Sequence, residues 1–127
     1  MLRARKGFTL IELLVVMVVI GILASISIPK FSSTKSKAYV AAMKSDLRNL
    51  MTAEEAYFSD SSKYVSDVTL LQYRTTTGVS APTLTMGPGL WTATVTHSQL
   101  AGVTCGISVN TTNPTIATAG EGEPACK

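Results

Sequence analysis

An apolar run over residues 8–28 constrains the fold of this chain more than any other feature. Between Leu13 and Ala24 it holds no polar side chain. A helix of this length, at about 1.5 Å per residue, reaches across the roughly 30 Å hydrocarbon core of a bilayer. The run therefore predicts a helix able to span a membrane, and the rest of the 127 residues is enough for one small domain.

One carboxylate, Glu12, lies near the outer end of the run. An acidic residue at the centre of a membrane helix costs about 2.5–3.5 kcal/mol, and somewhat less near its end, so it is kept mainly where it has a task. A secretory signal peptide cut near Ala24 or Ser25, or a plain membrane anchor, would explain the apolar residues. Neither explains Glu12, which we therefore interpret as a functional residue.

The excess of positive charge is confined to the start of the chain. There are 11 Lys and Arg against 8 Asp and Glu, and three of the basic residues are Arg3, Arg5 and Lys6. Without residues 1–7 the two signs balance, so nucleic acid stays possible as a partner but is not indicated by the charge. Basic residues before an apolar segment hold that end in the cytoplasm, which places the rest of the chain outside it.

The two cysteines, Cys105 and Cys126, then lie outside the cytoplasm, where thiols can be oxidised. We expect a disulfide that closes the C-terminal loop. In the loop-entropy account it stabilises the fold by about 3 kcal/mol. Two free thiols are the alternative.

Pro29 ends the apolar run. Proline removes the amide that would donate to the carbonyl of Ser25, and its ring crowds the preceding turn. We expect a kink or a local loss of helix at this point, eased by Ser25, Ser27 and Gly21.

Helical periodicity continues from Phe31 to about Ser59. Apolar residues recur there at steps of three and four, which is typical of a helix that buries one face on a sheet. These residues are Val40, Met43, Leu47, Leu50, Met51, Tyr57 and Phe58.

Lys30, Lys37 and Lys44 stand seven positions apart and therefore share one face of the predicted helix. We interpret them as a solvated face that also pairs with acidic neighbours such as Asp46. Contact with the phosphates of lipid or DNA is the alternative.

The region after residue 60 is rich in Thr, Ser, Gly and Pro and predicts short strands and loops. Leu90–His97 and Val103–Val109 are expected to form an antiparallel pair, with a third strand near Thr115–Ala119. The end of the chain from Gly120 is expected to be irregular and held by the second cysteine. A long N-terminal helix packed on a small antiparallel sheet makes the predicted fold class α+β.

Residues suited to catalysis or metal binding are sparse. His97 is the only histidine, and no nucleophile motif accompanies it. Two cysteines 21 positions apart with one histidine match no zinc spacing. Glu121 and Glu123 could bind a hard cation but fit a solvated loop better. We expect no enzyme activity, no cofactor and no metal.

The residues Lys6-Gly7-Phe8-Thr9-Leu10-Ile11-Glu12-Leu13-Leu14, followed by the apolar run and Ile28-Pro29, resemble the type IV prepilin signature, which the pseudopilins of type II secretion share. The resemblance covers about residues 3–30. A weaker likeness to the helix of bacterial major pilins continues through Ser45–Leu50 and Ala56–Asp60. It implies a pilin-like form of the α+β fold.

The resemblance implies four regions along the chain. They are a cytoplasmic leader peptide, residues 1–7, which is cleaved; a hydrophobic transmembrane and filament-core helix, residues 8–29; an amphipathic helix, residues 30–59; and a globular head, residues 60–127, with a connecting loop, an antiparallel sheet and a loop closed by the disulfide.

The resemblance also assigns roles to single residues. A prepilin peptidase would cut after Gly7 and methylate the new amine of Phe8. During assembly Glu12 would meet a Phe8 ammonium, either its own or that of a neighbouring copy. Gly21 and Pro29 would form the helix kink and permit local melting.

By resemblance the chain is a structural subunit, a major pilin, of an extracellular type IV pilus that serves adhesion, twitching motility or DNA uptake. Its partners would be copies of itself in a helical homopolymer, the prepilin peptidase and the pilus assembly machinery. The precursor would lie in the inner membrane with its N-terminus in the cytoplasm and its head outside. A pseudopilin of a type II secretion system and a lone membrane-anchored binding module are the alternatives.

Overall fold

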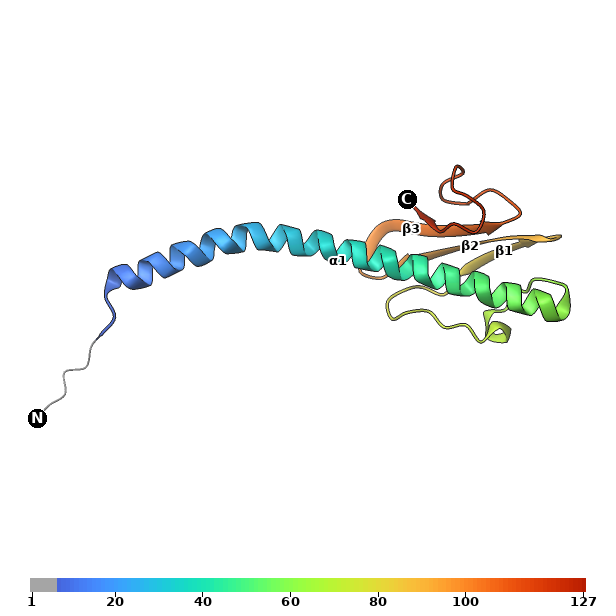
Figure 1. Ribbon diagram of the computed structural model, residues 1–127, viewed down its shortest axis with the longest axis horizontal. Helices are drawn as coiled ribbons and strands as arrows, with labels where there is room; N and C mark the ends of the chain where they lie inside the picture. Colours follow the sequence, from blue (N-terminus) through green and yellow to red (C-terminus); the bar gives the residue numbers. More distant parts are fainter. Residues whose placement is uncertain (1–6) are drawn as a thin grey trace, which may run out of the picture. The chain divides into compact units, whose positions relative to one another are not determined.

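Residues 7–127 are described by the computed structural model of this chain. The basic residues Arg3, Arg5 and Lys6, and with them most of the expected leader, lie outside the described residues. The elements are α1 (Leu10–Ser61), the 3-10 helix η1 (Val68–Leu71), β1 (Thr83–Gly87), β2 (Leu90–His97), β3 (Leu100–Val109) and β4 (Ala125–Cys126) (Figure 1). One long N-terminal helix and a small antiparallel sheet confirm the predicted α+β class.

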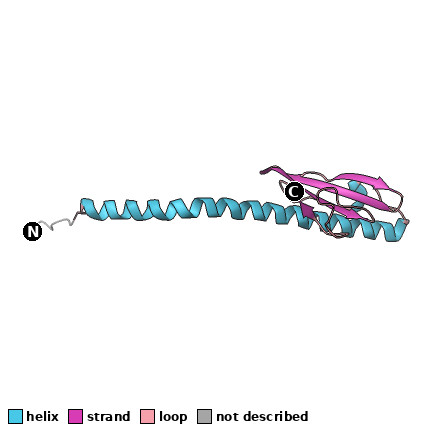
Figure 2. Cartoon of the chain, turned by 90° about the horizontal axis from the view of Figure 1, so that it is seen from above, coloured by secondary structure: helices cyan, strands magenta, loops and turns pink. Residues whose placement is uncertain are grey.

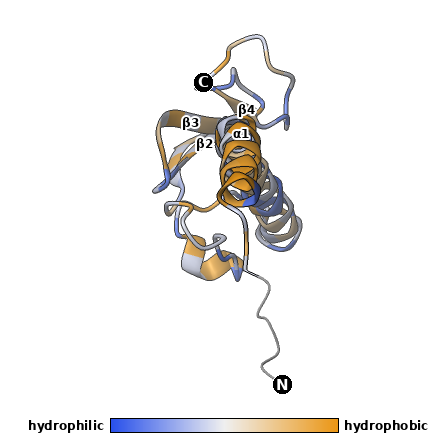
Figure 3. Cartoon of the chain, turned by 90° about the vertical axis from the view of Figure 1, so that its left-hand side faces the viewer, coloured by the Kyte–Doolittle hydropathy of each residue, from blue (hydrophilic) through white to orange (hydrophobic). Residues whose placement is uncertain are grey.

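Two compact units divide the chain between Lys35 and Ser36. In the first unit α1 is long and apolar enough to cross a membrane. Figure 3 shows the hydrophobic colouring of this helix. The large apolar side chains from Leu10 to Ile28 are between 49% and 80% exposed. Within this unit they have no apolar partner, so they need a nonpolar environment from elsewhere.

The helix continues without a break through Pro29. The expected local loss of helix is therefore wrong. Proline removes one amide donor, and the hydrogen bonds of the turns before and after it are enough to hold the helix. A kink at Gly21 and Pro29 stays a prediction.

In the second unit, the part of α1 after Ser36 packs one face on the sheet (Figure 2). Met43, Leu47 and Leu50 are fully buried. Their partners in the core include Trp91, Ala93 and Val95 of β2 and Cys105, Ile107 and Val109 of β3. This packing confirms the core face that the apolar periodicity predicts.

The four strands lie in the order β1-β2-β3-β4, and every pair is antiparallel. β2 has the predicted bounds, and β3 begins at Leu100, three residues earlier than predicted. The prediction named no strand at β1, whose five residues lie between Pro82 and Pro88. Proline beside a strand is typical of a sheet edge, which β1 forms.

The expected strand at Thr115–Ala119 is wrong, because the side chain of Asn113 organises this segment instead. Asn113 Oδ1 accepts hydrogen bonds from Thr115 N (2.9 Å) and Thr115 Oγ1 (2.7 Å). Asn113 Nδ2 donates to Gly106 O (2.9 Å) and Glu123 O (3.1 Å). The C-terminal segment therefore lies on β3 through Asn113.

Gly106 allows this close approach. A Cβ atom at this position would lie 2.9 Å from Pro114 Cγ and 3.0 Å from Thr115 Cγ2. Contacts of that length would force the C-terminal segment away from β3. The glycine is therefore required by packing.

A disulfide joins Cys105 to Cys126 with an S–S distance of 2.05 Å, as predicted. The two residues lie opposite each other in the β3–β4 pair. Thr104 and Lys127 beside them exchange two backbone hydrogen bonds of 2.9 Å. The expectation of an irregular end from Gly120 is thus wrong at Ala125–Cys126, where the covalent bond holds a short strand in place.

The sequence suggested that Asp46 pairs with the lysines of α1, and this prediction is wrong. Asp46 is 2% exposed. Its Oδ2 accepts from Thr76 N at 2.7 Å, and its Oδ1 accepts from Thr76 Oγ1 at 2.8 Å. Asp46 therefore ties α1 to the loop before β1.

Glu54 is a second buried carboxyl on α1. It has no exposed surface, and its Oε2 accepts from Val65 N at 3.1 Å. Its Oε1 is buried without a hydrogen-bond partner among the described residues. Burial raises the pKa of Glu54 above its ordinary value of 4.5, the Val65 amide opposes the shift, and the charge of Glu55 adds to it.

Asn113→Ala is expected to destabilise the head by about 2 kcal/mol, because it removes a buried amide that makes several hydrogen bonds. Trp91, the only tryptophan and fully buried, reports unfolding by its fluorescence in denaturant, using the oxidised full chain in detergent. Asn49→Ala on the exposed side of α1 is the matched control. Equal midpoints for the two variants would contradict the role of Asn113.

Glu54→Gln is expected to flatten the dependence of stability on pH. The raised pKa of Glu54 means that the folded protein binds this proton more tightly than the unfolded chain does. The free energy of unfolding of the parent protein should therefore fall as pH rises from about 4.5 through the raised value. Urea titrations at several pH values test this. Asp60→Asn, at an exposed acidic position of α1, should keep the slope, and a parent protein whose stability does not fall would sink the assignment.

Candidate functional site

Glu12 lies in the first turn of α1 and is the only acidic residue of this helix before Asp46. Glu12 Oε2 accepts hydrogen bonds from Thr9 N (2.8 Å) and Thr9 Oγ1 (2.7 Å). In return, Thr9 Oγ1 accepts from Glu12 N at 3.3 Å. Since Thr9 immediately precedes the helix, the two residues form a capping box, in which each side chain satisfies a backbone amide of the other.

The other oxygen of this carboxylate, Glu12 Oε1, has no hydrogen-bond partner among the described residues. Glu12 borders a groove on the helix surface that is otherwise apolar and is lined by Phe8, Ile11, Val15 and Val16. The Phe8 side chain is 90% exposed. The arrangement therefore presents one orientated carboxylate oxygen on an apolar surface, where it is suited to accept a cationic donor.

Phe8 and Glu12 both line this groove, and their pairing during assembly stays a prediction. Gly7 is exposed, lies before the helix, and has no atom within 4 Å of the position a Cβ would take. Gly21 is equally open. Thr9 was missed as a site residue, although the spacing Thr-x-x-Glu before an apolar run is a readable signal for a capping box.

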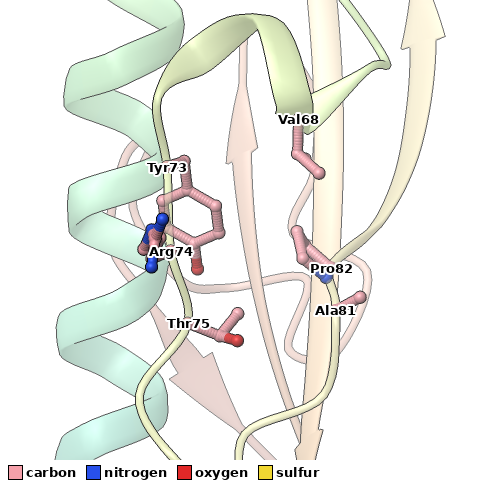
Figure 4. A pocket seen from close by; sticks show the side chains of 6 residues that line it. All are labelled: Val68, Tyr73, Arg74, Thr75, Ala81 and Pro82. Atoms are coloured by element: carbon pink, nitrogen blue, oxygen red, sulfur yellow. The ribbon is translucent and has the colours of Figure 1, made fainter.

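A second candidate site is a surface pocket on the head (Figure 4). Its lining residues are Val68, Tyr73, Arg74, Thr75, Ala81 and Pro82. Burial and the nearby charge of Asp46 raise the pKa of Tyr73 to about 12, so its hydroxyl stays protonated at neutral pH. The Tyr73 hydroxyl is itself buried without a hydrogen-bond partner among the described residues, and neither it nor the Arg74 guanidinium is a base or a nucleophile at that pH.

Three further polar residues singled out in the sequence, His97, Glu121 and Glu123, have structural partners. His97 Nδ1 accepts from Gln99 N at 3.1 Å, and its ring stacks on Tyr39 with 4.2 Å between centroids. Glu121 Oε1 accepts from the backbone amide of Asn110 at 3.0 Å. Glu123 Oε2 accepts from Gly120 N at 3.2 Å, so these two carboxylates order their own loops.

Comparison with known proteins also points to the start of the chain. Residues 2–28 match the family described as the prokaryotic N-terminal methylation motif. A fimbrial protein of Pseudomonas aeruginosa is 36% identical over 98 residues, which are 77% of this chain and 64% of that protein. The type IV major pilin protein PilA of Myxococcus xanthus is 42% identical over 59 residues, covering 46% of this chain and 27% of PilA.

The type II secretion system core protein G of Klebsiella michiganensis is 40% identical over 62 residues, which are 49% of this chain and 44% of that protein. The chain thus spans less than two thirds of the length of these relatives. The methylation motif, the similarity to fimbrial, pilin and pseudopilin proteins, and the single long helix with its small antiparallel sheet agree: the chain belongs to the superfamily of type IV pilins and type II secretion pseudopilins.

Proposed function

We propose that this chain is a major pilin, the structural subunit of an extracellular filament built from copies of itself through residues 8–29. The observation that carries the proposal is the start of α1, where an exposed apolar helix holds one orientated carboxylate, Glu12, beside Phe8. Similarity to a fimbrial protein over 77% of this chain supports the same role.

Processing would create the cationic partner of Glu12. We propose that residues 1–7 are a leader, that a prepilin peptidase cuts after Gly7, and that the new amine of Phe8 is methylated. The match to the N-terminal methylation motif over residues 2–28 and the exposure of Gly7 support this assignment. A methylated amine still carries a positive charge at neutral pH.

The amine and Glu12 would set the register of assembly. In a bilayer the apolar side chains of α1 gain little by leaving lipid for a neighbouring helix, since both surroundings are nonpolar. An ammonium and a carboxylate about 4 Å apart attract by about 1 kcal/mol in water and by about 4 kcal/mol at an effective dielectric of 20. A head-to-tail contact repeated from subunit to subunit builds an open helix.

The subunit would thus be a precursor in the inner membrane, with its head outside the cytoplasm, before it enters the filament. The regions 30–59 and 60–127 would be the amphipathic helix and the head displayed on the filament. The filament would serve adhesion, twitching motility or DNA uptake. Loss of one of these in a strain without the gene would show which. None of these roles requires catalysis.

A pseudopilin is the second candidate, because core protein G shares 40% identity over 62 residues. Both candidates assemble through the start of the helix and differ in where the filament lies. A major pilin should dominate the material sheared from the cell surface, whereas a pseudopilus would stay within the cell envelope. A lone membrane-anchored module would give no filament in either place.

Glu12→Ala should leave the protein in the membrane fraction and abolish filaments, as counted by electron microscopy of sheared material. Glu12→Gln is the sharper variant, since its amide oxygen can still accept from Thr9 but carries no charge. It should also lack filaments, and normal filaments from it would remove the role given to the charge. The subunit mass in parent filaments should correspond to a chain that begins at methylated Phe8.

Thr9→Val should loosen the first turn of α1, because loss of an N-cap hydroxyl costs about 1 kcal/mol. The amide of Glu12 should then exchange its hydrogen about fivefold faster in the detergent-solubilised full chain, measured by NMR. Thr9→Ser keeps the hydroxyl and should behave like the parent. Unchanged exchange in Thr9→Val would mean that the capping box does not hold this turn.

A further inference from the structure

The loop that follows α1, residues 62–66, is fixed to the head by acidic side chains from the last turns of the helix. Val65 N donates to Glu54 Oε2 at 3.1 Å, and Tyr64 Oη donates to Glu55 Oε1 at 2.9 Å. Two adjacent carboxyl groups therefore hold two adjacent residues of the loop. We call residues 62–66 the strap.

The strap covers an aromatic part of the core. The ring of Tyr64 stacks on Phe58 with 4.6 Å between centroids, and it is tilted against Trp91 with 6.2 Å between centroids. Trp91 has no exposed surface. Displacement of the strap would take Tyr64 away from Trp91, so the access of solvent to Trp91 reports whether the strap is closed.

Glu54 differs from Glu55 because its carboxyl group is enclosed. Glu54 has no exposed surface, and its Oε1 has no hydrogen-bond partner among the described residues. The neighbouring charge that shifts its pKa, that of Glu55, is also negative. A buried carboxylate without a cation is costly, whereas the neutral acid avoids this cost and can still accept from the amide of Val65.

The elements packed around Glu54 supply no countercharge. The buried side chains that the sheet presents to α1 do not titrate, and they are Trp91, Ala93, Val95, Cys105, Ile107 and Val109. On the strap, Lys63 is exposed and makes no ion pair within residues 7–127, and the pKa of Tyr64 is raised to about 12, so Tyr64 stays neutral. Beyond the strap, Asp67 is exposed. Glu121 of the C-terminal segment adds a negative charge near Tyr64.

We propose that Glu54 is a proton-controlled latch: the neutral acid holds the strap on the head, and the carboxylate releases it. Ionisation favours the open strap because the carboxylate can then reach water. Opening breaks the contact between Glu54 and Val65 and takes the ring of Tyr64 off Trp91. The latch lies within the head and does not depend on the proposed filament.

The direction of the pH dependence follows from the burial of Glu54. Burial raises its pKa above 4.5, the Val65 amide opposes this shift, and Glu55 adds to it. With the strap open, Glu54 meets water and titrates near its ordinary value. The closed strap thus binds the proton more tightly and is most populated in acid. The ratio of open to closed strap should rise by up to about tenfold per pH unit above pH 4.5 and become constant once the raised pKa is passed.

Hydrogen exchange of the Val65 amide tests the latch, measured by NMR on the oxidised full chain in detergent and corrected for the intrinsic pH dependence of exchange. The protection of this amide should fall by up to about tenfold per pH unit over that interval. Glu54→Gln keeps an acceptor for Val65 N but cannot ionise, so its protection should not change with pH. Asp60→Asn, at an exposed acid of the same helix, should keep the dependence of the parent.

A second amide separates opening of the strap from unfolding of the head. Thr104 N donates to Lys127 O at 2.9 Å beside the disulfide, and its protection should stay constant while that of Val65 falls. Parallel losses at both amides would mean unfolding of the whole head and would overturn the latch. Constant protection of Val65 in the parent, or a pH dependence that persists in Glu54→Gln, would also overturn it.

Fluorescence of Trp91 gives an independent readout of the strap. Quenching by acrylamide should increase with pH over the same interval in the parent and stay constant in Glu54→Gln, because only the parent loses the cover of Tyr64. Quenching that does not change in the parent would contradict displacement of the strap.

Discussion

The described head depends on the burial of one face of α1 against the sheet. Met43, Leu47 and Leu50 have no exposed surface, and each such side chain contributes about 1.5–3 kcal/mol through burial. Earlier in the same helix, the large apolar side chains are between 49% and 80% exposed. One helix therefore contains a segment that the chain covers by itself and a segment that must be covered by lipid or by other subunits.

The features that sequence predicts correctly are periodic or local. The helical stripe follows from the spacing of Met43, Leu47 and Leu50, and β2 follows from its run of β-branched and aromatic residues. The disulfide was predicted from the expectation that both cysteines lie outside the cytoplasm. Thr9 could have been found from its spacing to Glu12. Each of these signals lies within a few residues or rests on a single pairing.

The features that sequence misses depend on contacts between distant residues. Asn113 takes the place of a strand by binding Gly106 O and Glu123 O, and no periodicity signals such an arrangement. Asp46 and Glu54 are charged residues on the buried side of α1, where a hydrophobic pattern expects apolar ones. Asp46 is accommodated because Thr76, thirty positions away, supplies two donors. The candidate site was easier to predict than the head, since it lies within one turn of helix.

The capping box has a consequence for how the precursor relates to the mature subunit. All its atoms belong to Thr9 and Glu12, and none belongs to Gly7 or Phe8. The proposed cut between Gly7 and Phe8 would therefore remove no atom of the capping box and would add a positive charge in front of it. On the proposed function, the same helix start would serve the precursor and the filament subunit, and maturation would act as an electrostatic switch without a refolding step.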